Sequence, residues 1–315
     1  MIIAGPAYIV KKTGSNTTAT FKSETDITVT LTKETKERKA SHLGKFDEIL
    51  LSVKAEIKFK PVEWDNLDAL FPWPKMKLGQ TLFGDDEYDT KIYSADGQCY
   101  EFHKTAVTAS PAIGCGVEKD LLGECTITAL ISKNKKFSDT DALYARTPAT
   151  FNPPALVESK IFSIPFKVSY GATEVETEDG VDIDLQASTS ERKKDDVGLY
   201  DYLFTGLEVT AKFKPINCTE AEYEALARPQ GGVNRGRSLR AISSDLSIYG
   251  EAVGDPKFTI AKAVNAGSQT LTFGVEAARF GELEFRATST QYEVPKFSIG
   301  SVEADDTDAE SQDQG

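Results

Sequence analysis

The chain has 315 residues, of which 40 % are hydrophobic and 27 % are charged, and its formal net charge at pH 7 is −13. That length predicts about two domains, and no apolar run approaches the roughly 18 residues that a membrane-spanning helix needs. The acidic balance argues against wrapping a nucleic acid, because phosphate binding needs a clustered positive surface. We therefore expect an ordinary globular protein with no membrane partner.

The sequence begins Met1-Ile2-Ile3-Ala4-Gly5-Pro6. This segment lacks the basic and long apolar regions of a secretory signal, so we expect no export through the general pathway. The cysteines form no CxxC pair and only two histidines are present, so the spacing predicts reduced thiols and no zinc site. The four cysteines are Cys99, Cys115, Cys125 and Cys218.

The first part of the chain predicts antiparallel β-strands at residues 8–10, 27–31 and 51–59. Threonine and β-branched residues dominate these segments, and glycine and asparagine separate them. In residues 51–59 every second side chain is apolar, which is typical of a half-buried strand. The strand pattern starts again near residue 164 and continues at residues 181–185 and 207–213.

The sequence contains two copies of one unit. Lys58-Phe59-Lys60-Pro61 recurs 154 positions later as Lys212-Phe213-Lys214-Pro215, and Glu37-Arg38-Lys39 recurs at the same offset as Glu191-Arg192-Lys193. No gap is needed between these matches. The charged segments predict a solvated connection before the long strand, with a subunit contact as the alternative.

Each copy predicts one short helix after its Lys-Phe-Lys-Pro sequence. In the second copy, Thr219 and Glu222 have the spacing of a capping box. In the first, Trp64, Leu67 and Leu70 recur at helical spacing before a proline. We expect one face of each helix to cover a sheet, with Trp64 and Tyr223 as core anchors rather than ligand-stacking residues.

The segments after the helices differ between the copies, and both read as irregular loops. The first is rich in proline and the second in glycine, which is typical of functional or mobile loops. Their arginines fit phosphate or an acidic neighbour, and the acidic chain favours a carboxylate-bearing subunit. The candidate inter-subunit residues are Trp73, Lys75, Lys77, Arg235, Arg237 and Arg240.

Both copies end in one further matching pattern. Gly116-Val117-Glu118 precedes Gly123-Glu124, and Gly274-Val275-Glu276 precedes Gly281-Glu282, at the same spacing. Period-two strands follow each pattern. We expect a turn or hairpin in which Gly123 and Gly281 supply positive φ angles.

These patterns predict a mainly β protein with two tandem β-sandwich or barrel domains, each with one short flanking α-helix. The predicted boundaries are 1–146 for the first domain, 147–158 for a proline-rich linker and 159–301 for the second domain. Residues 302–315 are predominantly acidic and predict a disordered tail.

Nothing in the sequence predicts catalysis. Glu101 and His103 lie two positions apart on a predicted strand, and we interpret them as a surface pair. No phosphate-binding loop, nucleotide-binding glycine motif, metalloprotease motif or calcium loop is present. Glutamate pairs are common in so acidic a chain. We therefore expect no enzyme activity, no cofactor and no bound metal.

The organisation of both copies resembles the major tail tube proteins of long, flexible-tailed bacteriophages. The resemblance covers nearly the whole chain and lies in the long alternating strand, the Lys-Phe-Lys-Pro junction, the single helix, the loop and the closing Gly-Glu pattern. It implies tube domains of the β-sandwich type, six of which form a ring around a DNA channel. Most members carry one such domain per chain, so two domains imply trimeric rings of pseudo-sixfold symmetry, stacked into a tube.

The resemblance also implies a place and partners for the protein. It predicts a virion tail component, assembled in the host cytoplasm, that contacts itself and the tape measure, tail-tip and tail terminator proteins. A channel wall that lets DNA pass needs repulsion rather than binding. The candidate lumen-facing acidic residues are Glu56, Glu118, Glu124, Glu208, Glu276, Glu282 and Glu284.

Three alternatives remain open at this point. A tail-tip or baseplate ring protein shares the same fold. A paired β-sandwich module that binds cell surfaces or carbohydrate predicts a monomer with an exposed aromatic platform. An enzyme predicts a polar pocket, which the sequence does not indicate.

Overall fold

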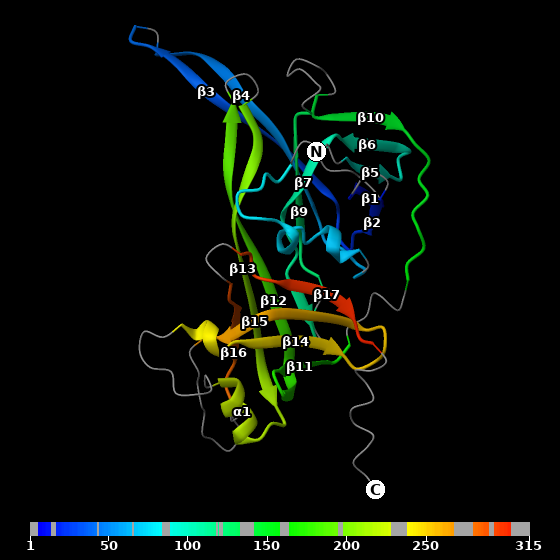
Figure 1. The fold of residues 1–315 in the computed structure, drawn as a ribbon. Coiled ribbons are helices and arrows are strands. Elements are labelled where there is room, and N and C mark those ends of the chain that lie inside the picture. Colours follow the sequence, from blue (N-terminus) through cyan, green and yellow to red (C-terminus); the bar gives the residue numbers. More distant parts are fainter. Residues whose placement is uncertain are drawn as a thin grey trace.

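The computed structural model describes most of the chain, and it is mainly β (Figure 1). The described residues are 6–13, 17–42, 44–64, 66–83, 89–117, 119, 122–132, 142–157, 164–194, 198–227, 238–267, 280–289 and 293–303. The predicted tail after residue 303 lies outside this set. No described helix is long and apolar enough to cross a membrane.

The first copy forms two antiparallel sheets. One has the strand order β10-β6-β5-β1-β2 and the other the order β3-β4-β9-β7. The strands are β1 (Ala7–Lys12), β2 (Thr18–Lys22), β3 (Thr28–Ala40), β4 (Gly44–Phe59), β5 (Thr90–Ser94), β6 (Gln98–Phe102), β7 (Lys104–Ala109), β9 (Cys125–Leu130) and β10 (Tyr144–Pro148). We call these strands and their connections the first unit.

The second copy, which we call the second unit, follows the same topology with fewer and longer strands. Its elements are β11 (Phe166–Tyr170), β12 (Thr173–Lys194), β13 (Gly198–Ile216), α1 (Glu220–Ala227), β14 (Ser244–Gly250), β15 (Pro256–Asn265), β16 (Leu283–Ala287) and β17 (Phe297–Ser301). The long strand β12 takes the places of β2 and β3, and β15 takes those of β6 and β7. The two sheets of this unit are therefore continuous through shared strands.

The register of the long hairpins is the same in both units. Thr28 pairs with Lys58 in β3–β4, and Asp182 pairs with Lys212 in β12–β13, at the 154-residue offset. Register shifts also coincide, following Glu34 in one hairpin and Ser188 in the other. The duplication predicted from sequence therefore extends to individual backbone pairs and bulges.

The two sheets of each unit face each other across aromatic contacts. Phe21 of β2 meets Phe59 of β4 with ring centroids 5.9 Å apart, and Tyr170 of β11 meets Phe285 of β16 at 4.9 Å. Phe59 and Phe213 end the alternating strands as buried residues, 1 % and 2 % exposed. Apolar burial of this kind is the main stabilising term of such a fold.

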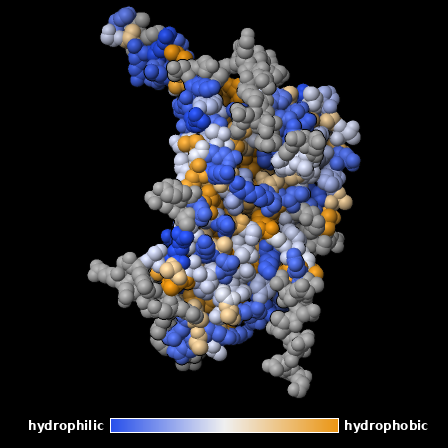
Figure 2. Space-filling view, in the orientation of Figure 1, coloured by the Kyte–Doolittle hydropathy of each residue, from blue (hydrophilic) through white to orange (hydrophobic). Residues whose placement is uncertain are grey.

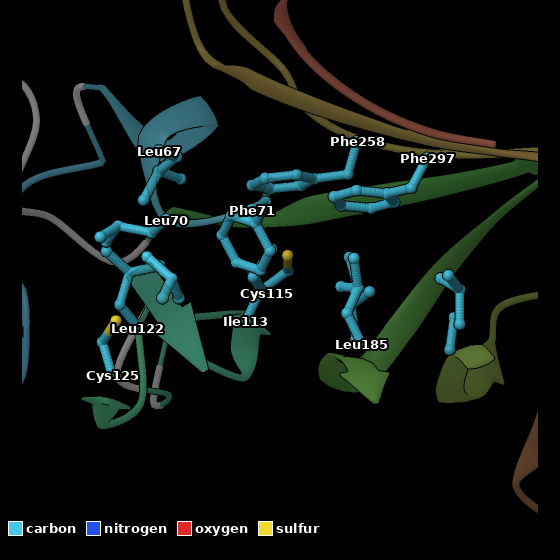
Figure 3. Packing of buried hydrophobic residues seen from close by; sticks show 14 of the residues in the cluster. Leu67, Leu70, Phe71, Ile113, Cys115, Leu122, Cys125, Leu185, Phe258 and Phe297 are labelled. Atoms are coloured by element: carbon cyan, nitrogen blue, oxygen red, sulfur yellow. The ribbon is translucent and has the colours of Figure 1, made fainter. Parts of the chain in front are cut away.

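Buried residues of the two units also meet in one continuous cluster. Figure 3 shows Phe71 of the first unit beside Phe258 and Phe297 of the second. The ring centroids of Phe71 and Phe297 are 6.1 Å apart. In addition, β8 (Ile113–Cys115), from the first half of the sequence, pairs with β12 of the second. The units are thus joined by packing as well as by the connecting segment.

The prediction of an α-helix in the first copy is wrong. The described chain there has two single 3-10 turns, Leu67–Ala69 and Trp73–Lys75. Asn66, at φ 60°, begins the first turn in the left-handed region, and prolines at 72 and 74 lack the N–H groups that a continuing helix needs. The apolar residues of these turns are nevertheless buried in the core.

The second helix matches its prediction. Thr219 Oγ1 accepts a hydrogen bond from Glu222 N at 3.2 Å, and Glu222 Oε2 accepts one from Thr219 N at 2.6 Å, which completes the capping box. Tyr223 is buried and stacks on Phe280, and Trp64 packs half-buried against the core. Both aromatic residues are core anchors, as expected.

The prediction that the glycines of the Gly-Glu pattern supply positive φ angles is wrong. Neither Gly123 nor Gly281 has a positive φ angle. A Cβ at Gly123 would instead lie 3.3 Å from the backbone nitrogen of Ala112, whose oxygen accepts a hydrogen bond from Gly123 N at 2.8 Å. Close backbone approach is therefore what favours glycine at this position.

None of the four cysteines forms a disulfide, as predicted; three are buried and Cys218 is partly exposed. The burial of two lysines, Lys11 and Lys104, was not predicted. Lys11 of β1 is 6 % exposed, and burial lowers its pKa from 10.5 to about 8. Between pH 8 and 10.5 the unfolded chain therefore binds a proton that the folded chain does not, so this group makes stability rise with pH.

Lys11 should add a rising contribution to the urea midpoint between about pH 8 and pH 10, whereas the buried Cys115 and Cys125, whose pKa values burial raises, add a falling one. The Lys11→Met variant removes the buried charge, so the slope of its midpoint against pH should be less positive than that of the wild type in that window. Urea denaturation followed by circular dichroism measures both slopes. Equal slopes for the two proteins would contradict the assignment.

Candidate functional site

The end of the β12–β13 hairpin packs on the first unit. We call this contact the inter-unit junction; on the hairpin side it comprises Lys193 and residues 198–204, and on the other side Glu34, Leu51, Ser52, Trp73, residues 79–83, Lys104, Ala106 and Leu130. In Figure 1 the hairpin rises from the second unit and reaches the middle of β3–β4. Part of the first unit therefore acts as an acceptor for a hairpin.

Backbone pairing forms the centre of the junction. Phe204 exchanges two hydrogen bonds with the loop that follows β4, from Gly79 N to its oxygen and from its nitrogen to Gln80 O, both 2.9 Å long. Leu82 N donates to Tyr202 O at 2.8 Å. Residues 79–82 thus add a short strand to the edge of β13, which satisfies backbone groups that would otherwise form an open edge.

Aromatic packing covers this added strand. Phe204 and Trp73 are both fully buried and stack with ring centroids 5.8 Å apart. Trp73 Nε1 donates a 2.7 Å hydrogen bond to Ser110 Oγ, so its one polar atom is satisfied. The pair joins one residue of each unit.

A second apolar group lies nearer the end of the hairpin. Leu199 and Tyr202 of β13 pack on Phe83, Ala106 and Leu130 of the first unit. The rings of Phe83 and Tyr202 are 6.0 Å apart and nearly parallel. This group covers the outer face of the β3-β4-β9-β7 sheet at β7 and β9.

Polar groups set the position of the hairpin end. Lys104 Nζ donates a 2.6 Å hydrogen bond to Tyr200 O, and Asp201 Oδ1 accepts one of 3.1 Å from Phe83 N. Lys193 pairs with Glu34 at 3.0 Å on the exposed side. The second charged Glu-Arg-Lys segment therefore contacts the other unit of the same chain, whereas the alternative interpretation from sequence was a contact between subunits.

Gly198 begins β13 at the point of closest approach. Its φ is 70°, and a Cβ there would lie 2.2 Å from Leu51 O. Any other residue would push the hairpin away from β4. Glycine occupies the same position, Gly44, at the start of β4.

The equivalent hairpin of the first unit, β3–β4, contributes Glu34, Leu51 and Ser52 to the junction, but its end is not docked on any described residue. Its end projects from the body of the molecule in Figure 1 and stands clear of it in Figure 2. Leu50 is 38 % exposed, whereas its counterpart Phe204 is fully buried. Leu31 is 40 % exposed, whereas its counterpart Leu185 is 4 % exposed and belongs to the main core rather than to the junction.

Four of the large apolar residues that the described surface exposes lie on this one hairpin. They are Leu31, Ile49, Leu50 and Leu51. We call them the hairpin patch. Exposed apolar residues gathered on one element mark an interaction surface, and Phe204, the counterpart of Leu50, is buried in the inter-unit junction.

In the second unit, only some counterparts of the acceptor residues are described, because those of residues 79–81 fall between 228 and 237, outside the described residues. Lys104, buried against the docked hairpin, has the exposed Lys262 as its counterpart, because the β7–β9 and β15–β16 registers agree at a 158-residue offset. Ser52, also buried, corresponds to the half-buried Gly206. Among the described residues, the chain therefore exposes one hairpin end and, at Lys262, the counterpart of one acceptor residue.

The predicted inter-subunit loop residues lie in different settings. Trp73 is buried between the two units of the same chain, while Lys75 and Lys77 are exposed beside it. Arg240 is exposed on the 3-10 turn Leu239–Ile242. Arg235 and Arg237 lie outside the described residues.

Several predicted lumen-facing glutamates share the outer faces of the sheets, where they alternate with buried residues. Glu56 pairs with Lys54 at 2.9 Å, and Glu124 pairs with Lys58 at 3.3 Å. Glu282 is exposed, and Glu118 and Glu276 lie outside the described residues.

The second unit repeats this mixture of charges. Arg286 pairs with Glu284 at 2.7 Å and with Glu208 at 3.5 Å, and it lowers the pKa of Glu284. Lys212 lies 3.6 Å from the same Glu284. These faces therefore carry networks of both signs rather than carboxylates alone.

Apart from Trp73, sequence reasoning missed the residues that form the junction, above all Phe204, and it also missed Leu50, the exposed counterpart of Phe204. Both occupy positions of a half-buried strand, so the pattern gave no reason to separate them from core residues. A comparison of the aligned hairpins finds the signal, because an apolar residue recurs at this position in both copies.

Comparisons with known proteins assign no family to the chain. No protein-family model matches it, and no curated protein matches it significantly. The functional argument therefore rests on the molecule itself.

Proposed function

We propose that this protein is a structural subunit that assembles head to tail into rings, and that the rings stack into the tube of a bacteriophage tail. One observation carries the assembly step. The chain holds one hairpin docked on one acceptor, and it exposes the end of a second hairpin and Lys262, the counterpart of the acceptor residue Lys104. We infer that the exposed hairpin end of one copy docks on the second unit of the next.

This contact joins two different surfaces, so it is heterologous and repeats in one direction around a ring or along a helix. The junction inside the chain supplies the rotation between successive units. With two units per chain, a ring of six units needs three chains. The tail-tube resemblance of the sequence favours that number and the stacking of rings around DNA.

The charged outer faces suit a conduit. Carboxylates repel the phosphates of passing DNA, and the lysine and arginine partners described above hold the glutamates in place. The glutamates predicted from the sequence to face the lumen stay the candidates for the channel wall. Tape measure, tail-tip and terminator proteins are the expected partners, and the virion tail is the expected location.

A carbohydrate- or surface-binding module is less well supported. That function needs an exposed aromatic platform, and the aromatic residues that were candidates for it are packed in the core: Tyr223 is 4 % exposed and Trp64 is half-buried. The proposal assigns the chain a structural role without catalysis. A tail-tip ring built in the same way remains the nearest alternative.

Negative-stain microscopy and light scattering of the purified chain test the proposal. We expect rings with the mass of three chains, or tubes made of such rings, to increase with protein concentration. A monomer at every concentration would overturn the assembly step. Single rings that never stack would favour the tail-tip alternative.

The acceptor surface gives a specific prediction. Lys262→Glu should weaken association by at least about 10- to 100-fold, because it replaces the counterpart of the lysine that binds a hairpin carbonyl in the inter-unit junction. Sedimentation equilibrium measures the dissociation constant. Lys296→Glu, an equal charge change at another exposed lysine, is the matched control and should associate normally. Equal weakening by both variants would show that the change in net charge, and not the position of Lys262, causes the effect.

A further inference from the structure

A cluster of three potential metal ligands lies at one end of β5 and β6, outside the junction. One donor atom each from Asp89, Glu101 and His103 lies within 4.8 Å of the other two. The strand register explains their meeting. Thr90 pairs with Phe102, so Asp89 lies opposite His103, while Glu101 and His103 are two positions apart and share a face.

The imidazole of His103 supplies an independent sign of a missing partner. Its Nε2 is buried and has no hydrogen-bond partner within the described part of the chain. Buried side-chain nitrogens normally have a hydrogen-bond partner, and leaving one without costs free energy. A metal ion satisfies such a nitrogen, because neutral imidazole is a common ligand of transition metals.

The carboxylates indicate that the missing partner carries a positive charge. Asp89 and Glu101 are both half-buried, and an oxygen of each lies within 4.8 Å of the other. Two acids are thus held close together in a partly dry place. Lys91, 3.2 Å from Glu101, offsets part of this charge from one side.

The sister unit shows that the fold does not need this trio. In the matching register of β14 and β15, Asp89 corresponds to Asp245, Glu101 to Thr259 and His103 to Ala261. Asp245 there accepts a hydrogen bond from Lys262 N at 2.9 Å and has no acid or imidazole at these partner positions. The ligand set is therefore a property of the first unit alone.

We propose that Asp89, Glu101 and His103 bind one divalent transition-metal ion, with Zn²⁺ as the best-suited probe. One imidazole and two carboxylates match the nitrogen and oxygen ligands that zinc takes, and water completes the coordination. Magnesium is a poor match, because it prefers oxygen ligands in octahedral geometry. The ion ties the start of β5 to the end of β6, while Lys91 moves away from Glu101.

Titration of the full-length chain with ZnCl₂ in a calorimeter, with a parallel thermal melt, tests the proposal. We expect one saturable site and a higher melting temperature with zinc, and neither effect with MgCl₂. His103→Ala should weaken binding by at least about 10-fold. His42→Ala removes an exposed histidine of the β3–β4 turn and should bind as the wild type does.

Absence of saturable zinc binding, or equal binding by the wild type and His103→Ala, would overturn the proposal. If His103→Ala fails to fold, Glu101→Gln provides the second variant, because it removes the charge of one half-buried ligand and keeps the volume of its side chain. Circular dichroism without metal shows whether each variant is folded. These results do not depend on whether copies associate, so they test the metal site separately from the assembly.

Discussion

Leu50→Glu should leave the chain folded and prevent copies from associating. Leu50 is the counterpart of Phe204, which is buried when its hairpin docks, so a carboxylate there would be carried into an apolar contact without a partner. We expect the dissociation constant between copies to increase by about 100-fold or more. Sedimentation velocity at several concentrations measures the change.

Leu78→Glu is the matched control, because Leu78 is equally exposed, at 38 %, and lies outside the hairpin patch. It should associate as the wild type does. The unfolding midpoint of Leu50→Glu should stay close to that of the wild type, since its side chain is partly solvated already. A Leu50→Glu chain that still assembles would show that the hairpin patch is not the contact.

Phe204→Ala should destabilise the folded chain by about 3–5 kcal/mol, because it leaves a cavity beside Trp73 at the centre of the inter-unit junction. The backbone bonds to Gly79 and Gln80 stay possible, so the hairpin keeps its path. Urea denaturation followed by tryptophan fluorescence reports the loss, and Trp73 itself is one of the two tryptophans observed.

The same truncation in the first unit, Leu50→Ala, should cost much less stability in the isolated chain, because that side chain is exposed until a second copy covers it. It should instead weaken association. Similar losses of stability for Phe204→Ala and Leu50→Ala would mean that both side chains are equally buried in the isolated chain.

The duplication could be predicted from sequence because it rests on local patterns that need no knowledge of the fold. The 154-residue offset of Lys58-Phe59-Lys60-Pro61 fixed the alignment, and the structure repeats it in strand pairs and bulges. The capping box of Thr219 and Glu222 is equally local. The first helix failed as a prediction because Asn66 takes a left-handed backbone conformation, which interrupts a helix whatever the apolar spacing.

The inter-unit junction could not be predicted because it depends on which surfaces meet in space. Trp73 was a candidate for contact between subunits, and the described chain places it in contact with another unit of the same chain. Leu50 and Phe204 look alike in the alternating pattern, and only the fold shows that one is covered and the other exposed. The site thus emerges from comparing the two copies within one structure.

The most direct test of the central claim is to mix two variants that each lack one half of the contact. Leu50→Glu keeps a working acceptor, and Lys262→Glu keeps a working hairpin. We predict that each is a monomer alone and that the mixture forms a complex of one copy of each and no larger species, as measured by mass photometry. A mixture that stays monomeric, or one that forms full rings, would contradict head-to-tail assembly through these surfaces.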